Sequence, residues 1–403
     1  MISTQFELIN QANTWVAEQI FSFHNRGIEP KKADFLAEAK ELFPSLDLDE
    51  NWLLLTIRRA WRENRKSETR QRTPEQWAKI FPRYPMAEDG FALAFKPDHS
   101  SQIVEAMQEF GLVVVHVLNK QECLRSRQAI LEEINAQPLA TRQAKINWEQ
   151  PWTWEDCNWA MNGKFLVSDP AFHQQAFNNR IHENIYQVYS TLWNETHLQV
   201  NVDLWGICRG TCGLSFPQPD GSFPLQNRED WRLEITKHWD HNPWLLVEDS
   251  KQGLIPGYQG FVALANQEIS TGCHLTLPGS HRFLEQWCVE NTQTPIAGKE
   301  RVSGRPMLDD PILEYMQPIP VREGDMIIFT WGQLHSAVPN RNSTMRLHQF
   351  IRMFPAVDIN PFYAEYESST LQKLLPRYSD RFDINNIELS DWGRKLLGLE
   401  SWI

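Results

Sequence analysis

The second half of the chain consists largely of short strand candidates, and this pattern restricts the possible folds more than any other feature. Between residues 198 and 354, runs of apolar and β-branched residues are separated by Gly, Pro, Asn and Asp. The candidates are LQVNVDL (198–204), RLEITKHW (232–239), GFVALAN (260–266), CHLTL (273–277), QPIPV (317–321), DMIIFTW (325–331) and RLHQFIRMF (346–354). Many short strands at this spacing, without helices between them, predict an antiparallel barrel or jelly roll.

The segments on either side of these strands have a different character. Residues 1–85 place apolar residues at helical spacing, as in QFELINQANTWVAEQIFSF, and predict an N-terminal helical extension. From residue 98, a helix, a short buried strand (112–117) and a second helix lead into the strand region. We therefore predict a mainly β protein with flanking helices, divided into the extension (1–85), a β domain (98–357) and a C-terminal tail (358–403) that packs on the core.

Charge and composition exclude several classes of function. The 39 Lys and Arg residues against 51 Asp and Glu residues give a net charge of −12, which argues against a general binder of nucleic acid or anionic membranes. The N-terminus lacks the pattern of a secretion signal, and no segment approaches the roughly 18 apolar residues of a membrane span. Six scattered cysteines favour free thiols. We expect a cytoplasmic protein whose partner is a small molecule.

The segment EITKHWDHNPW (234–244) contains a candidate metal site. Side chains alternate along an extended strand, so His238 and Asp240 face one side while His241 faces the other. A third ligand must come from elsewhere, and His335 is the best candidate because it follows the strand DMIIFTW. Two histidines and one carboxylate form a facial triad that suits Fe(II), whereas a structural zinc site is more often closed by four protein ligands. A His-x-Asp tripeptide also occurs by chance in many proteins.

Arg346 is a second indicator of the same chemistry. It follows His335 by 11 residues and begins the next strand candidate. A buried arginine at this position would form a two-pronged salt bridge with a dicarboxylic cosubstrate whose other end chelates the iron. Taken alone, Arg346 also fits a surface strand residue.

Together these residues resemble a known family. The segments HWD (238–240), GCHLTLPGSHR (272–282) and REGDMIIFTWGQLHSAVPN (322–340), followed by Arg346, resemble the phytanoyl-CoA dioxygenase family of Fe(II)/2-oxoglutarate oxygenases. The resemblance covers residues 98–355 and implies a double-stranded β-helix, the jelly roll of cupins. It implies His238, Asp240 and His335 as catalytic iron ligands and Arg346 as the partner of the distal carboxylate of 2-oxoglutarate.

The same resemblance implies a reaction. Fe(II), 2-oxoglutarate and O₂ would be the cofactors, with ascorbate as the reductant in vitro, and 2-oxoglutarate would be decarboxylated to succinate. The coupled step would oxidise an unactivated C–H bond of a small molecule. Related enzymes that halogenate have a small residue at the position of Asp240, so hydroxylation is the default expectation. Desaturation or oxidative cyclisation remains open.

Further contacts to the cosubstrate are less directly implied. Phe261 stands where family members carry an aromatic residue beside the cosubstrate, although a core strand residue fits equally well. Ala337 occupies a place where some members use a hydroxyl to bind the distal carboxylate. Ser336 and Ser343 are candidates for that missing contact.

Several residues near these motifs receive other interpretations. His241 is at best a neighbour of the metal or a substrate contact, His281 belongs to a turn, and His348 has a hydrogen-bonded core role. The Trp-rich segment 147–167 is either a lid over the barrel or a surface excursion. Candidates for a substrate carboxylate or phosphate are Lys164, Arg209 and Arg232.

Two other functions remain open at the level of the sequence. One is a non-catalytic jelly-roll binding protein, and the other is a cupin-type metalloenzyme that does not use 2-oxoglutarate. Arg346 favours the oxygenase, because neither alternative needs a buried arginine at that spacing.

Overall fold

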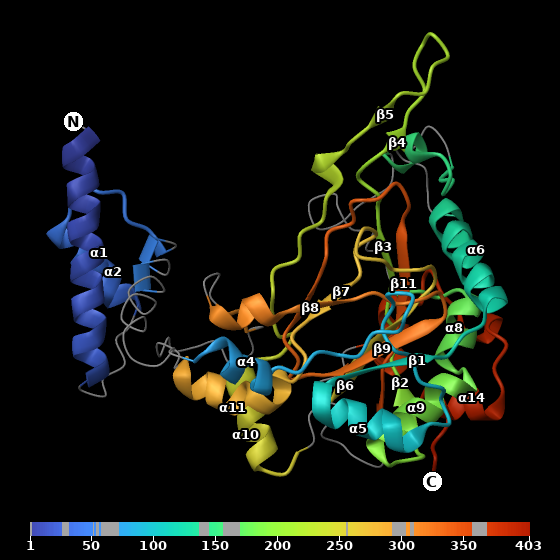
Figure 1. Cartoon of the computed structure of the whole chain (residues 1–403). Helices are drawn as coiled ribbons and strands as arrows, with labels where there is room; N and C mark the ends of the chain where they lie inside the picture. Colours follow the sequence, from blue (N-terminus) through green and yellow to red (C-terminus); the bar gives the residue numbers. More distant parts are fainter. Residues whose placement is uncertain are drawn as a thin grey trace.

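The computed structural model describes residues 2–25, 32–50, 52–53, 56–57, 72–136, 145–155, 170–254, 257–291, 304–306, 310–356 and 369–403. Antiparallel sheets occupy the centre, and helices surround them (Figure 1). None of the helices in these ranges is long and apolar enough to cross a membrane.

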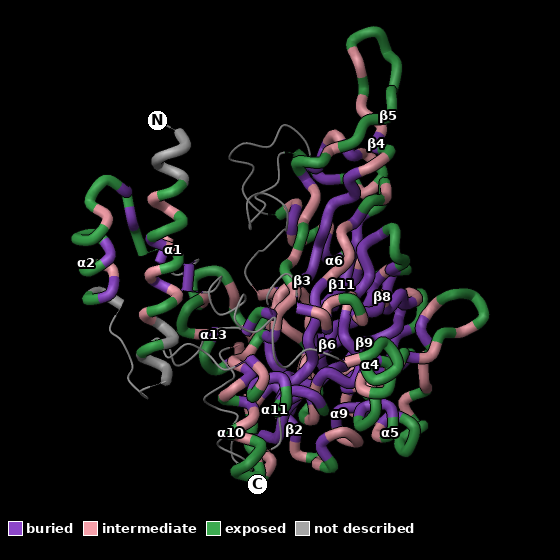
Figure 2. Tube along the Cα trace, turned by 60° about the vertical axis from the view of Figure 1, so that its left-hand side comes forward, coloured by how far each residue is buried: buried purple, intermediate pink, exposed green. Residues whose placement is uncertain are grey.

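The larger sheet has five strands in the order β1-β9-β6-β11-β3, and every pairing is antiparallel. These are β1 (Leu112–His116), β3 (Trp205–Cys208), β6 (Tyr258–Ala263), β9 (Asp325–Thr330) and β11 (Arg346–Phe350). All six residues of β9 are buried, because the strand lies between two neighbours and is covered on both faces. Figure 2 shows buried residues concentrated along β6, β9 and β11.

The smaller sheet consists of β10 (His335–Ala337), β7 (His274–Thr276) and β8 (Gln317–Ile319), in that order. The segment around His238 joins its β10 edge through a single antiparallel bridge, in which His238 and His335 exchange backbone hydrogen bonds of 3.0 and 3.1 Å. From β3 to β11 the chain passes repeatedly from one sheet to the other, which is the winding of a jelly roll. The predicted mainly β core with flanking helices is confirmed.

Several predictions about individual elements were wrong. RLEITKHW (232–239) contains no regular strand, only the bridge at His238. RLHQFIRMF divides after Phe350, because β12 (Met353–Pro355) turns away to pair with β2 (Leu198–Val200). Helices also interrupt the strand region. LPGSHR is not only a turn, because Gly279 is followed directly by helix α11 (Ser280–Glu290), whose first turn contains His281.

Helices cover the sheets on several sides (Figure 1). The described helices of the β region and tail are α5 (Ser100–Phe110), α6 (Lys120–Ala136), α8 (Gln174–Arg180), α9 (Glu183–Trp193), α10 (Pro243–Lys251), α11, α13 (Leu371–Tyr378) and α14 (Asp391–Leu396). A small hairpin of β4 (Leu214–Ser215) and β5 (Leu225–Gln226) projects from the body. The tail contacts the core, where Phe382 stacks on Phe172 at 4.2 Å between ring centroids.

The N-terminal region contains α1 (Ile2–Asn25), α2 (Lys32–Leu42) and α4 (Pro74–Ile80). The apolar side chains of α1 and α2 pack in two small clusters whose described members all lie between residues 8 and 57. Trp77 and Phe81 instead pack in the main core, beside Phe283 and Tyr315. The boundary at residue 85 between extension and core stays a prediction.

Candidate metal centre

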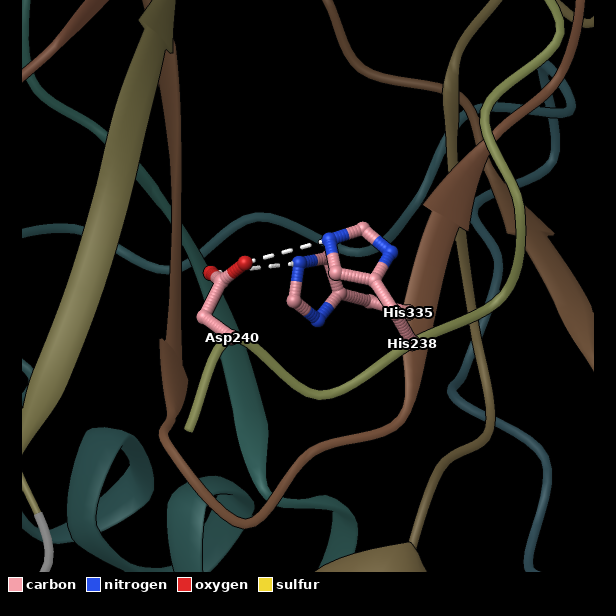
Figure 3. Close-up of side chains that lie close together, drawn as sticks. All are labelled: His238, Asp240 and His335. Carbon is pink, nitrogen blue, oxygen red and sulfur yellow. Dashed lines mark hydrogen bonds and ion pairs between the residues drawn. The ribbon is translucent and has the colours of Figure 1, made fainter. Parts of the chain in front are cut away.

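Three side chains with metal-binding atoms converge at the edge of the smaller sheet. The Nε2 atom of His238 lies 3.1 Å from Oδ1 of Asp240, and Nε2 of His335 lies 3.5 Å from Oδ2 of the same carboxylate. One ligand atom from each residue lies within 4.8 Å of the other two. Figure 3 shows both imidazoles turned toward the carboxylate. Within the described ranges, no other group of three His, Cys, Asp or Glu residues meets this condition.

Backbone carbonyls orient both imidazoles. The Nδ1 atom of His238 lies 2.7 Å from the carbonyl oxygen of Thr236, and Nδ1 of His335 lies 3.0 Å from that of Gln333. A carbonyl only accepts, so each Nδ1 must donate, and each Nε2 of a neutral ring carries a lone pair. Two such lone pairs and a carboxylate then face one another, an arrangement that a divalent cation stabilises. The donor set therefore fits a metal ion.

The electrostatics of the cluster favour the metal-binding forms of Asp240 and His335. Withdrawal from water alone would raise the pKa of the Asp240 carboxyl, but His335 and His238 hold that pKa well below its usual range. Burial lowers the pKa of His335 and so favours the neutral imidazole. Burial acts in the same direction on His238, but the Asp240 carboxylate outweighs it and raises the pKa. Metals bind ionised carboxylates and neutral imidazoles.

The cluster opens into a cavity of about 450 Å³ whose wall also contains Arg346. Arg346 is only 6% exposed, and its Nε atom donates to Oε1 of Gln267 at 3.0 Å. No carboxylate of the described chain pairs with its guanidinium. Burial lowers the pKa of Arg346, which shows the cost of holding this charge away from water.

The other predicted cosubstrate residues have different positions. Phe261 is buried in the cavity wall, with the Arg346 guanidinium 5.6 Å from its ring centroid. Ser336 and Ala337 also reach the wall, but the Ser336 hydroxyl donates to the carbonyl oxygen of Ile235 at 2.7 Å. Ser343 does not line the cavity. The roles of Phe261 and Ser336 stay predictions.

Two histidines were not predicted to belong to this cavity. His348 lines it, and its buried Nδ1 has no hydrogen-bond partner among the described residues, so the predicted hydrogen-bonded core role was wrong in this respect. His274 also lines it, with its ring 5.8 Å from that of His335. The buried Nε2 of His274 likewise has no hydrogen-bond partner in the described part of the chain. A signal was present for His274, because it lies in a strand candidate and imidazoles are seldom fully buried.

The remaining candidates lie away from the cavity. His241 stacks on Trp331 with ring centroids 4.1 Å apart. Arg209 packs over Trp231, and Arg232 pairs with Glu229 and Glu234. Lys164 and residues 156–167 of the Trp-rich segment lie outside the described residues. Trp148, Trp152 and Trp154 of the same segment do not line the cavity.

The chain was compared with known protein families, sequences and structures. No family model matches the chain. A Dictyostelium discoideum protein named "Putative phytanoyl-CoA dioxygenase" is 21% identical over 322 residues, which is 73% of this chain and 86% of the relative.

Among solved structures, the chain is similar to GlcNAc Inducible Gene 2 (DUF1479) from Candida albicans, at 12% identity and a TM-score of 0.47, covering 81% of this chain and 82% of that one. It is also similar to the epimerase SnoN in complex with Fe3+, alpha ketoglutarate and nogalamycin RO, at 15% identity and a TM-score of 0.41, covering 65% and 85%. The sequence relative confirms the resemblance to the phytanoyl-CoA dioxygenase family that the motifs indicate.

Proposed function

We propose that the protein is an Fe(II)/2-oxoglutarate-dependent oxygenase that oxidises an unactivated C–H bond of a small molecule. One observation carries this proposal: the cluster of His238, Asp240 and His335 shares a cavity with Arg346, a buried cation without a carboxylate partner in the described chain. The similarity to the D. discoideum relative supports it.

His238, Asp240 and His335 would hold the metal on one side and leave its other positions free for ligands. When both are bound, iron and 2-oxoglutarate would enable O₂ to oxidise the C–H bond of the substrate. The Nδ1 hydrogen bonds to Thr236 and Gln333 keep both Nε2 atoms directed at the metal.

Arg346 would bind the distal carboxylate of 2-oxoglutarate. A guanidinium offers two parallel N–H donors to a carboxylate, and a buried cation is most stable when an anion neutralises it. Apolar side chains that include Leu233, Ile235 and Phe350 make up much of the cavity wall and would keep water from the reacting carbon. Because Asp240 supplies a carboxylate ligand, hydroxylation is the reaction we propose first.

The cupin-type metalloenzyme and the binding protein explain less of this arrangement. Both can use the metal cluster, but neither accounts for a buried arginine that faces the same cavity. We therefore favour an enzyme that uses a dicarboxylic 2-oxo acid.

The test is succinate release from 2-oxoglutarate in the presence of Fe(II) and ascorbate, first with a broad pool of metabolites and then with the fractions that stimulate it. We expect Asp240→Ala to reduce succinate release by at least about 100-fold, because a ligand of the metal is lost. Asp89→Ala is the matched control, since this exposed carboxylate pairs with Arg322 on the surface.

Isothermal titration of 2-oxoglutarate into the Mn(II)-loaded protein provides a readout independent of the substrate. Metal-dependent binding in the wild type and its loss in Asp240→Ala are the expected results. An absence of both succinate release and metal-dependent binding in the wild type would rule out the oxygenase.

A further inference from the structure

His348 is a buried imidazole that the proposed mechanism does not yet use. It lies two residues after Arg346 on β11, so the two side chains share one face of the strand. Both line the cavity, and they are 2% and 6% exposed. The cation and the imidazole are therefore presented to the same space.

The hydrogen bonding of His348 is incomplete. Its Nδ1 is buried and has no hydrogen-bond partner among the described residues. A buried polar atom without a partner is unfavourable, and such atoms in native proteins are rare enough to require an explanation. His348 lines the cavity, so a ligand bound there can supply the missing partner.

The neighbouring strand leaves room for this imidazole. Gly206 on β3 pairs with His348 across the sheet. A Cβ atom at residue 206 would overlap the His348 ring at Nε2, Cε1 and Cδ2. A glycine at this register position therefore permits the observed position of the ring.

The Phe261 ring lies close to both His348 and Arg346. Its centroid lies 5.0 Å from that of His348 and 5.6 Å from the central carbon of the guanidinium. Burial and the charge of Arg346 hold the pKa of His348 well below its ordinary value. The ring is therefore neutral, and it can donate one N–H without adding a second buried charge.

We propose that His348 is the second contact to the distal carboxylate of 2-oxoglutarate, donating an N–H to one of the two carboxylate oxygens that Arg346 also binds. It would replace the hydroxyl that the chain lacks at Ala337. Ser336 is a poorer candidate, because its hydroxyl already donates to Ile235. This inference rests on the proposed use of 2-oxoglutarate and adds a specific contact to it.

The test compares two 2-oxo acids of equal chain length. 2-Oxoglutarate and 2-oxopentanoate both chelate a metal through the 2-oxo acid end, but only the first has a distal carboxylate. Each is titrated calorimetrically into the Mn(II)-loaded wild type and His348→Leu. We expect the variant to lose roughly 10-fold to 100-fold in affinity for 2-oxoglutarate, as for a hydrogen bond to a charged group. Its affinity for 2-oxopentanoate should be unchanged.

Two further variants separate hydrogen bonding from packing. His348→Asn has nearly the shape of His348→Leu but keeps an N–H donor, so it should recover part of the affinity for 2-oxoglutarate. Gly206→Ala should displace the ring and also weaken 2-oxoglutarate binding. Thermal melting of each protein checks that it is folded.

The outcomes distinguish this inference from the function on which it rests. If the wild type binds 2-oxoglutarate but His348→Leu binds it equally well, or loses both acids alike, His348 does not contact the distal carboxylate. If the Mn(II)-loaded wild type binds neither acid, the use of 2-oxoglutarate fails, and this inference fails with it.

Discussion

At the scale of single residues, the site contains polar side chains that are costly to bury and that lack part of their hydrogen bonds or ion pairs. Within the described chain, Arg346 has a hydrogen bond to Gln267 but no carboxylate partner, and the Nδ1 atom of His348 has no hydrogen-bond partner. Such groups reduce the stability of the free protein, and a ligand that satisfies them binds more tightly for the same reason. Ligand binding and stability should therefore respond in opposite directions to changes at these positions.

Arg346→Met is expected to stabilise the protein and to prevent cosubstrate binding. The desolvation penalty of a buried ion is several kcal/mol. It exceeds the loss of one hydrogen bond, about 1 kcal/mol. We therefore expect the free energy of unfolding without 2-oxoglutarate to rise by about 1–2 kcal/mol, measured by chemical denaturation.

The ligand response provides the second half of this prediction. 2-Oxoglutarate at 100 times its dissociation constant should stabilise the metal-loaded wild type by about 2.7 kcal/mol and the variant by almost nothing. Arg322→Met is the control, because Arg322 is partly exposed and pairs with Asp89 away from the cavity. A destabilised Arg346→Met would show that the arginine has a structural partner instead.

At the scale of elements, the strands that border the site could be located from the sequence more readily than the segments between them. β9 is a run of six buried residues, and its strand pattern is unambiguous. The segment before His238 has a similar residue pattern but joins the sheet only at one bridge. The Pro-Gly pair before α11 predicts a turn. The helix that follows buries residues at helical spacing, among them Phe283, Leu284 and Trp287. The helical period was therefore present in the sequence.

Gly111 ends helix α5 and lies close to Gln333, a residue that contacts the proposed metal ligand His335. It has a φ of +73°, its N–H donates to the carbonyl oxygen of Met107, and its own carbonyl accepts from Thr330. A Cβ atom at this position would overlap the side-chain Oε1 of Gln333 and the ring of His281. The backbone carbonyl of the same Gln333 orients the His335 ring. A side chain at residue 111 should therefore disturb both folding and the metal ligand.

Gly111→Ala and Gly90→Ala form a matched pair, because both glycines have positive φ but only Gly111 has close neighbours. The left-handed conformation alone should cost Gly90→Ala about 1–2 kcal/mol of unfolding free energy. Overpacking should add about 1–3 kcal/mol for Gly111→Ala, which should also bind Mn(II) more weakly. Equal losses in the two variants would show that Gln333 and His281 move aside freely.

At the scale of the whole molecule, the described apolar contacts separate the first helices from the β core. The clusters of α1 and α2 draw their described members from residues 8–57, whereas Trp77 and Phe81 belong to the main core. Arg72 already pairs with Glu290 of α11. The packing of the core therefore extends back to about residue 72.

A chain that begins at residue 72 should fold and should retain metal-dependent binding of 2-oxoglutarate. A chain that begins at residue 86 should be much less stable, because it lacks Trp77, Phe81 and Tyr84, each of which is almost fully buried. Thermal melting and the Mn(II) titration compare both with the full chain. Similar stability of the two shortened chains would show that α4 is dispensable for the core.

The sequence by itself determined the local part of the site. His238 and Asp240 stand two residues apart, as do Arg346 and His348, so strand alternation predicts that each pair shares a face. Both pairs line the cavity. Only the tertiary structure decided which pairs meet. His335 on the edge strand β10 meets His238, 97 residues earlier in the chain, through a single backbone bridge. Gly206 leaves space for His348 on a neighbouring strand. The absence of a carboxylate partner for Arg346 in the described chain is likewise a tertiary property, because ion pairing depends on every element that packs around the charge.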